Sequence, residues 1–345
     1  MIRRARVLVP LMVAALLGAG CQPPSSWTTP VSGLAPVLLS VWGSSPTDVW
    51  AVGGTCDQAD CKNTAQSLVL HFDGSSWTKR DAGAKAILWW VHGFAPDDVW
   101  IAGEQGTILH FDGARFTPQA EGLAPDVKLF GIWGKTPRAL WAVGGKPDQS
   151  STVLRFDGAT WSKDMTAPSI QDGQFGGTWF KVWGSAADDV WLVGQRGSLV
   201  RWNGAAYEKQ DLSPLGVKAQ GLFTAAGRAR DDVYVVGGDF GRGLALHFDG
   251  QRWENVAGLD LSQSPLLTGV YETSAGDVTI TGMSGMKFRK DGATWHDDNA
   301  FMPYADLHAV WMAGPNDVFA VGGNFVAQKN GVVAHYGAAI PGTIK

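Results

Sequence analysis

Residues 41–53 are Val41-Trp42-Gly43-Ser44-Ser45-Pro46-Thr47-Asp48-Val49-Trp50-Ala51-Val52-Gly53, and Leu70-His71-Phe72-Asp73-Gly74-Ser75-Ser76-Trp77 follows. The chain repeats this pattern, with variations, to its end. With Trp42 as the phase mark, the equivalent positions are His92, Trp133, Trp183, Phe223, Tyr271 and Trp311. The successive spacings are 50, 41, 50, 40, 48 and 40 residues. A period of this length indicates a repeat architecture in which each unit is one supersecondary motif.

The composition favours short strands over helices. The chain has 345 residues, of which 45% are hydrophobic, and it can therefore bury a substantial core. Gly (45) and Trp (17) are abundant, whereas charged residues are only 17%. Many turns and many large aromatic side chains, without long Lys- and Glu-rich runs, are typical of a β protein.

Each unit contains four short segments that we interpret as strands. In the first unit they are 38–42, 48–53, 68–72 and the segment around Trp77, and we name them A to D in that order. The Asp-Gly pair between strands C and D is a strong hairpin signal, and we expect positive φ at both of its residues. It recurs at Asp112-Gly113, Asp157-Gly158, Asp249-Gly250 and Asp291-Gly292, with Asn203-Gly204 as the equivalent in the fourth unit.

The two ends of the chain complement each other. The seventh unit runs through strand C at 332–336 and has no strand D before Lys345. Residues 25–30, around Trp27, resemble residues 75–80, which form the first strand D. The sequence therefore predicts an all-β, seven-bladed β-propeller of four-stranded antiparallel blades, closed by the N-terminal strand joining the C-terminal blade. We expect the propeller to cover residues 27–338 and a tail to cover 339–345.

The repeat resembles those of bacterial exported propellers, akin to the sialidase-type (Asp-box, BNR) and Ycf48-like proteins. The shared pattern is Trp-Gly-x-x-x-x-Asp-Val-Trp-x-Val-Gly followed by Phe-Asp-Gly-x-x-Trp, and it covers residues 27–337. The segment 290–295 is one residue shorter than an Asp-box between its Asp and its Trp. In the sialidase-type proteins the box is a structural hairpin away from the active site. The resemblance therefore implies a fold and no catalytic activity.

The first 20 residues are typical of a secretory signal. Arg3, Arg4 and Arg6 precede an apolar run over 7–17, and small residues lead to Cys21. This arrangement resembles a bacterial lipobox, although Gly18 stands where Leu is usual. The resemblance implies a signal peptide at 1–20, lipidation of Cys21, a tether over 21–26 and, from Gln22, an outer-membrane location in the cell envelope. An ordinary signal peptide with an incidental cysteine is the alternative.

The remaining charge and cysteines limit the classes of partner. Removing the three arginines of the signal leaves 25 basic residues against 32 acidic ones, which argues against nucleic acid as a partner. No later apolar run reaches the 18 residues of a transmembrane helix, so we expect membrane contact through the N-terminal lipid only. Cys56 and Cys61 are predicted to form a disulfide in an exported protein. A metal at this pair is the less favoured interpretation, and we expect no cofactor.

Loop lengths distinguish the two faces of the predicted disc. The A–B and C–D turns share one face, the short-turn face, and are nearly uniform. The B–C and D–A connections share the opposite, long-loop face, and the longer ones are 54–67, 145–151, 167–178, 238–243 and 323–331. Because variable loops on a rigid scaffold usually carry binding, we expect recognition on the long-loop face. Residue 27 should lie on the short-turn face, so that the long loops point away from the membrane.

Five aromatic residues are predicted to cluster where strands A begin, at the long-loop mouth of the central channel. They are Trp89, Trp90, Phe130, Trp179 and Phe180. Such a cluster suits stacking on a sugar ring or an apolar peptide, and we take these residues as the candidate ligand site. The competing interpretation is that they plug the channel or pack beneath the loops.

Catalytic constellations are weak in this sequence. Four histidines (His71, His110, His247 and His335) recur in strands C, but equivalent positions of different blades are too far apart to share a metal. The aspartates that begin strands B, Asp48 and its equivalents, are explained as turn residues that bond their own backbone. A glycosidase needs a converging carboxylate pair, and nothing pairs the acids of the long-loop face. Those acids are Asp57, Asp60, Glu104, Asp172 and Asp239.

A sialidase also needs three converging arginines, and only Arg196 and Arg242 lie in B–C loops. The sequence therefore favours a non-enzymatic lipoprotein of the envelope that binds a protein or glycan, or acts as a scaffold, through its long-loop face. The alternative is a carbohydrate-active enzyme of sialidase-like architecture. A purely structural surface module is a third hypothesis.

Overall fold

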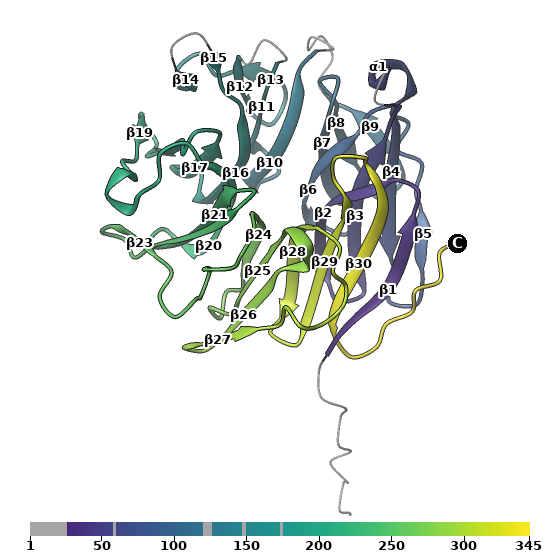
Figure 1. Ribbon diagram of the computed structural model, residues 1–345. Helices are drawn as coiled ribbons and strands as arrows, with labels where there is room; N and C mark the ends of the chain where they lie inside the picture. The colour runs from purple at the N-terminus through teal and green to yellow at the C-terminus, as the bar shows by residue number, and fades with distance from the viewer. Residues whose placement is uncertain (1–25, 58–59, 120–125, 147–149, 173–174) are drawn as a thin grey trace, which may run out of the picture.

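The structure is a computed structural model, and it describes residues 26–345 except 58–59, 120–125, 147–149 and 173–174. The predicted signal peptide at 1–20 and Cys21 with its tether up to residue 25 lie outside the described residues. The described chain forms seven four-stranded antiparallel sheets, the blades, and one two-stranded hairpin. In Figure 1 the blades follow one another around a central axis, in the order of the colour bar.

Successive strands of each blade run from the channel to the rim. The inner strands A are β2 (Val37–Ser45), β6 (Leu88–Ala95), β10 (Lys128–Thr136), β16 (Trp179–Ala186), β20 (Gly221–Ala229), β24 (Leu267–Glu272) and β28 (Leu307–Gly314). Strands B are β3 (Asp48–Thr55), β7 (Asp98–Gly103), β11 (Ala139–Gly145), β17 (Asp189–Gly194), β21 (Asp232–Asp239), β25 (Val278–Gly282) and β29 (Asp317–Asn324).

Strands C are β4 (Gln66–Phe72), β8 (Ile108–Phe111), β12 (Ser151–Phe156), β18 (Leu199–Trp202), β22 (Arg242–Phe248), β26 (Lys287–Asp291) and β30 (Lys329–Gly337). Strands D are β5 (Trp77–Lys79), β9 (Phe116–Pro118), β13 (Trp161–Lys163), β19 (Tyr207–Lys209), β23 (Trp253–Asn255), β27 (Thr294–Asp297) and, for the seventh blade, β1 (Ser26–Leu34). The connections hold α1 (Cys61–Thr64), the hairpin β14 (Gln171–Asp172) and β15 (Phe175–Gly176), and the short 3-10 turns η1 (Ser213–Leu215) and η2 (Met283–Gly285).

The predicted closure is confirmed. Strand β1 pairs with β30, with Trp27 opposite Tyr336 and Leu34 opposite Gly331. The Trp27 indole N–H also donates to Asp298 Oδ2 of the sixth blade at 2.8 Å, so this residue occupies the place that strand D aromatics hold elsewhere. The last inner strand, β28, contacts the first, β2, and the ring of inner strands is therefore continuous.

The C–D hairpins depend on an aspartate side chain as well as on glycine. Gly74 has φ of 86°, whereas Asp73 is absent from the residues with positive φ, so the expectation of positive φ at both residues is wrong. Asp73 Oδ1 instead accepts the backbone N–H groups of Ser75 and Ser76, each at 2.8 Å, as in an Asx turn. The Ser75 hydroxyl, which also donates to Oδ1 at 2.7 Å, and these two backbone bonds hold the pKa of the Asp73 carboxyl down at about 2.

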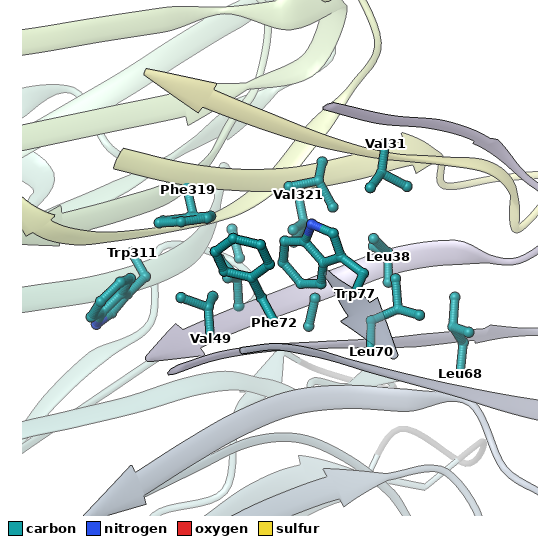
Figure 2. Packing of buried hydrophobic residues seen from close by; sticks show 14 residues of the cluster. Val31, Leu38, Val49, Leu68, Leu70, Phe72, Trp77, Trp311, Phe319 and Val321 are labelled. Carbon is teal, nitrogen blue, oxygen red and sulfur yellow. The ribbon is translucent and has the colours of Figure 1, made fainter. Parts of the chain in front are cut away.

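The aromatic residues of strands B, C and D meet across the blade interfaces. Trp50 of the first blade contacts Phe111 and Phe116 of the second, with ring centroids 5.0 and 5.9 Å apart. At the seam where the ring closes, Phe319 contacts Phe72 and Trp77 in the same way, at 6.2 and 6.4 Å (Figure 2). Aromatic pairs of this kind add about 0.5–1.5 kcal/mol each beyond the area that they bury. The aromatic motif residues of one unit therefore pack against those of the next unit.

The C-terminal tail adds a second connection across the same seam. Thr343 O accepts the N–H of Trp77 at 2.9 Å, and Lys345 N–H donates to Trp77 O at 2.8 Å. The tail therefore runs parallel to β5 as a fifth element of the first blade, through an Ile344 bridge to Trp77. Since the tail follows β30 of the seventh blade, it links the seventh blade to the first at the rim (Figure 1).

At four of the seven interfaces an inner strand contacts the next through a tryptophan side chain that lies against a glycine. A Cβ placed on Gly93 would lie 2.5 Å from ring carbons of Trp42, and one on Gly43 would lie 2.8 Å from Trp311. Trp133 and Trp183 cover Gly184 and Gly227 in the same manner. The Trp-Gly pair of the repeat thus takes part in two interfaces. Its indole packs against the following blade, and its glycine makes room for the aromatic side chain of the preceding blade.

The fifth blade corrects one sequence alignment. The residue paired with strand B at the phase mark, as Trp42 is with Trp50, is Ala226 opposite Tyr234, and not Phe223. Phe223 lies three residues earlier on β20. Phe223 is the aromatic residue nearest the expected spacing, because the true equivalent, Ala226, carries only a methyl group.

The predicted faces are confirmed by the strand directions. Helix α1, in a B–C connection, and the β14–β15 hairpin, in a D–A connection, lie at the top of Figure 1, and β1 begins near the bottom. Trp27 pairs with Tyr336 at the end of a strand C, which is where the C–D turns lie in other blades. Residue 27 is therefore on the short-turn face, as expected.

A substitution at the indole contact tests this packing. Gly93→Ala should lower the free energy of unfolding by about 1–3 kcal/mol, because the new methyl group overlaps the Trp42 ring. Urea denaturation followed by tryptophan fluorescence measures the loss. Gly314→Ala is the matched control, since a Cβ there meets nothing within 4 Å. An equal effect of both substitutions would contradict the role assigned to the Trp-Gly pair.

Candidate functional site

Every inner strand contains a β-bulge at the same position. In β2, Leu38 pairs with Gly53 and Ser40 with Val52, so Leu39 is the extra residue. A bulge re-aims the side chain of the extra residue, and here it does so seven times. We call these seven residues the bulge ring, and they are Leu39, Trp89, Phe130, Phe180, Phe223, Thr268 and His308.

Aromatic members of the bulge ring touch one another around the long-loop end of the channel. Trp89 lies 4.9 Å from Phe130, Phe130 lies 6.0 Å from Phe180, and Phe180 stacks on Phe223 at 4.8 Å, all measured between ring centroids. Phe325, from the B–C loop of the seventh blade, contacts Trp89 at 5.6 Å and His308 at 5.3 Å. These rings form an aromatic arc at the mouth. It runs from Phe325 of the seventh blade to Trp89 of the second and on to Phe223 of the fifth.

The structure brings four of the five predicted site residues into the channel. Trp89, Phe130 and Phe180 belong to the bulge ring, and Trp90 is the next residue, further toward the short-turn face. Trp179 does not join them. It is 1% exposed within the core between the third and fourth blades, and its indole N–H donates to Pro168 O at 3.2 Å. Phe223, which the sequence analysis had used as a phase mark, takes its place at the mouth.

A lysine crosses the channel beneath this arc. Lys181 Nζ donates to Phe130 O at 2.6 Å and lies 4.4 Å from the centroid of the Trp90 ring. Burial lowers the pKa of Lys181 to about 7. Burial likewise lowers the pKa of His308 to about 4, with the Lys181 charge acting in the same direction. The channel is a medium that disfavours charge, so its ionisable groups shift toward their neutral forms.

The long-loop face carries all the exposed large apolar side chains of the described residues. Six of them lie in connections of the fifth to seventh blades: Phe240, Phe301, Met302, Tyr304, Phe325 and Val326. Met165, in the connection between the third and fourth blades, is the seventh. Exposures of 80% for Phe240 and 73% for Val326 leave most of these side chains in water. These side chains make the long-loop face the candidate interaction surface.

The connection that carries Phe301 and Met302 is held by a buried lysine. Lys287 is fully buried, and its ammonium donates to Gly285 O at 2.6 Å, Phe301 O at 2.9 Å and Pro303 O at 3.2 Å. Burial lowers the pKa of Lys287 to about 8, so the ammonium still predominates at neutral pH. The exposed apolar side chains are therefore displayed on an ordered loop. The sequence analysis missed this connection, although three large apolar residues in four positions after strand D are a visible signal.

The disulfide predicted for the first long loop is confirmed. Cys56 and Cys61 are bonded, with Cα atoms 4.8 Å apart. Both cysteines pack against a small cluster that includes Leu39 and Trp89 of the bulge ring. The disulfide therefore braces the loop beside the mouth.

A pocket lies at the opposite end of the channel and opens on the short-turn face. Its volume is about 410 Å³, and all seven inner strands line it. Residues at the phase mark form its wall, the pocket ring: Trp42, His92, Trp133, Trp183, Ala226, Tyr271 and Trp311. In the sequence these positions served only as phase marks of the repeat, whereas in the structure four of their tryptophans both pack on the next blade and line this pocket.

The pocket also holds an acid that the sequence analysis missed. Glu272 lines the pocket beside Arg228, and its side chain is 1% exposed. Burial raises the pKa of Glu272 to about 8, and the neighbouring Asp232 adds to the shift while Arg228 opposes it. A signal was present in the sequence, since Glu272 and Met312 stand where the first five blades have glycine after the phase mark.

The repeated histidines and aspartates serve the blades themselves. In five blades the histidine or arginine of strand C binds the aspartate that begins strand B, as in His71 with Asp48 at 2.6 Å and Arg201 with Asp189 at 2.6 Å. The partners of these described carboxylates are side chains, so the prediction that they bond their own backbone is wrong. The third blade has Ala139 at this place, and Arg155 pairs instead with Asp164 at 2.6 Å. Within the described ranges no group of three or more His, Cys, Asp or Glu is placed to hold a metal ion.

Three of the acids considered for catalysis on the long-loop face, Glu104, Asp60 and Asp239, have structural partners in the described part of the chain. Glu104 is 5% exposed and binds Lys128 Nζ at 2.7 Å. Asp60 accepts two contacts from Asn63, and Asp239 accepts the N–H of Gly241 at 3.0 Å. These groups have local structural partners. No helix in the part of the chain that the structure describes is long and apolar enough to cross a membrane.

The fold is that of a seven-bladed β-propeller, and comparison with known proteins agrees at that level. No protein-family model matches the sequence, and no curated protein matches it. Among solved structures, "YCF48 bound to D1 peptide" is similar with a TM-score of 0.60 and 14% identity over 92% of this chain and 98% of that one.

Two further solved structures show the same likeness. YCF48 from Cyanidioschyzon merolae has a TM-score of 0.60 at 15% identity, over 90% of this chain and 98% of that one. The GH74 xyloglucanase from Xanthomonas campestris has a TM-score of 0.59 at 14% identity, over 87% of this chain and 52% of that one. At these identities the likeness establishes the fold.

The low polarity of the channel can be tested at Lys181. Because the pKa of this amine falls to about 7 on folding from an ordinary value near 10.5, the unfolded chain binds more protons between these values. Wild-type stability therefore gains from Lys181 as pH rises from 7 toward 10.5, and the full cost of its charge is present below 7. The stability advantage of Lys181→Met should accordingly shrink between pH 6 and 10 by a few kcal/mol, at most about 5.

Urea denaturation at a series of pH values measures this difference. Lys209→Met, at an exposed position of β19, is the control, and its difference from wild type should stay constant. If the Lys181→Met difference is equally constant, the channel is not the apolar medium described above.

Proposed function

We propose that this protein is a non-enzymatic binding module of the cell envelope that captures an apolar protein segment on its long-loop face. The observation that carries the proposal is the gathering of exposed apolar side chains on that face, chiefly in the connections of the fifth to seventh blades. Burying a side chain such as Phe240 or Val326 against a partner stabilises a complex by about 1.5–3 kcal/mol per residue. A few such contacts are sufficient for specific binding.

The ordered display of these side chains supports the same function. Lys287 fixes the Phe301–Pro303 segment through three carbonyl groups, so less conformational entropy is lost when a partner binds. The aromatic arc at the mouth gives a rigid apolar floor next to these loops. A propeller of similar fold has been solved with a peptide bound, which is consistent with a protein partner.

We further propose that the chain is anchored through a lipid on Cys21, at the outer membrane, with membrane contact through the lipid only. Trp27 lies on the short-turn face, and the anchor would therefore hold that face toward the membrane and present the long loops to the surroundings. A full-length chain labelled metabolically with palmitate tests the anchor. We expect label in the wild type and none in Cys21→Ser, and equal labelling of both would contradict lipidation at this residue.

Photocrosslinking tests the binding face. A photoreactive amino acid placed at Phe240 or Val326 in the full chain, expressed in its envelope, should give discrete protein adducts. The same group at Gln251, an exposed position on the short-turn face, is the control and should give none. The adducts should be lost when Phe301→Ser and Met302→Ser are combined, because these substitutions remove apolar area without touching the core.

Two outcomes would contradict the proposal. Equal adducts from Gln251 and Phe240 would show that the long-loop face has no preference for a partner. Binding of the folded chain to a glycan, unchanged by the Phe301 and Met302 substitutions, would favour the carbohydrate-active alternative.

A further inference from the structure

The pocket ring has one gap, and an acid stands beside it. Six members of the ring carry an aromatic or imidazole side chain, whereas the fifth blade contributes Ala226. The following blade has Glu272 where a glycine receives the indole elsewhere, as Gly93 receives Trp42. The small side chain leaves room for the carboxyl group, so the pocket has apolar aromatic walls and one acidic sector.

The carboxyl group of Glu272 is only partly satisfied by its neighbours, among which the Arg228 backbone N–H donates to it. Its Oε2 atom is buried and has no hydrogen-bond partner among the described residues. Its Oε1 atom lies 3.5 Å from Arg228 Nε, but that nitrogen donates to Asp232 Oδ2 at 2.6 Å. A buried polar atom without a partner costs about 1–3 kcal/mol. The sector is therefore short of hydrogen-bond donors, and a ligand that supplies N–H groups would remove the cost.

We propose that this pocket binds a primary alkylammonium group, whose alkyl stem lies against the aromatic wall and whose N–H groups donate to Glu272 Oε2 once the carboxyl group, which is buried in the empty pocket, turns toward the ligand. Indole and phenol faces attract cations, and a desolvated carboxylate forms charge-assisted bonds with N–H donors. The channel already contains one such contact, because the ammonium of Lys181 lies 4.4 Å from the Trp90 ring at the inner end of the pocket. The inference is independent of the function proposed for the long-loop face.

An anion fits the pocket less well. Of the two basic residues that line it, Arg228 is held by Asp232, and Lys135 is exposed at the rim. A neutral polar ligand would satisfy Oε2 but would gain nothing from the charge of the acid. A primary ammonium is favoured over a quaternary one, since only the former has N–H donors. Such a group is present both in free amines and in ethanolamine lipid headgroups.

The ionisation of the pocket predicts a pH dependence. The empty pocket keeps Glu272 largely protonated at pH 6, because its pKa is raised to about 8, and a bound cation draws this proton off. Affinity for an ammonium should therefore rise between pH 6 and 9. Other groups near the carboxyl were considered: His92 is neutral in this range, with a pKa lowered to about 4, and burial raises the pKa of Tyr271. Lys181 loses its charge in the same range, which also favours a cation.

Calorimetric titration of the full chain in detergent tests the site, with n-butylammonium as the probe and 1-butanol as its neutral counterpart. The wild type should bind the ammonium at least about 10-fold more tightly than the alcohol at pH 8, and should release protons on binding. Glu272→Gln should lose this preference and the proton release, and keep only the weaker pH dependence that Lys181 imposes. Glu254→Gln, on exposed β23, is the matched control and should behave as the wild type.

Folding of the variant is checked separately. Glu272→Gln removes an unsatisfied buried acid, so its melting temperature should equal or exceed that of the wild type. Co-sedimentation with vesicles then distinguishes the sources of the ammonium. A Glu272-dependent preference for phosphatidylethanolamine over phosphatidylcholine would assign the site to a lipid headgroup, whereas binding of n-butylammonium without that preference would assign it to a free amine. Equal affinity for the ammonium and the alcohol, or a preference retained in a folded Glu272→Gln, would overturn the proposal.

Discussion

Neighbouring blades of this propeller meet where an aromatic side chain of one blade lies against the glycine backbone of the next. The contact of Trp42 with Gly93, and of Trp311 with Gly43 at the seam, leaves no space for a methyl group. Further out, Phe319 against Phe72 and Trp77 repeats the contact that Trp50 makes with the second blade. Since most blades take part in such contacts with the blade before and the blade after, the ring gains most of its stability only when it is complete. Strand β1 and the C-terminal tail satisfy that condition at the one place where the chain is not continuous.

The same packing makes the channel a place where charge is disfavoured. Rings from all inner strands surround it, and groups that enter it respond in the direction that desolvation requires. The pKa of Lys181 falls to about 7, that of His308 falls to about 4, and that of Glu272 rises to about 8. A polar group in such surroundings lowers the stability of the protein, and the fold itself does not require such a group. The two ends of the channel differ accordingly, with an apolar arc below the long loops and an aromatic pocket with one acid at the short turns.

The sequence was sufficient to predict the fold, because the residues that recur in each repeat are the ones that form the interfaces between blades. Asp-Gly turns, the strand aromatics and the incomplete seventh unit together imply seven blades and their closure. The aromatic residues at 89, 130 and 180 were also found, since they break the regular pattern. Trp179 was misplaced because neighbouring residues of a strand face opposite ways, and the bulge that decides which one enters the channel has no mark in the sequence. Glu272 was overlooked because a search for pairs of acids passes over a single acid in a glycine position.

The match between a side chain and the gap that receives it also fixes which blade can follow which. Blades with an indole at the phase mark, such as those of Trp133 and Trp183, require a glycine after the phase mark of the next blade. The sixth blade, with Glu272 at that position, is compatible with Ala226 before it and would collide with an indole. A library that exchanges blades should therefore tolerate replacement among the first four more readily than movement of the sixth. The residues at the blade interfaces therefore fix the order of the repeats. A design that lengthens or shuffles the ring must transfer both contacting residues of each interface together.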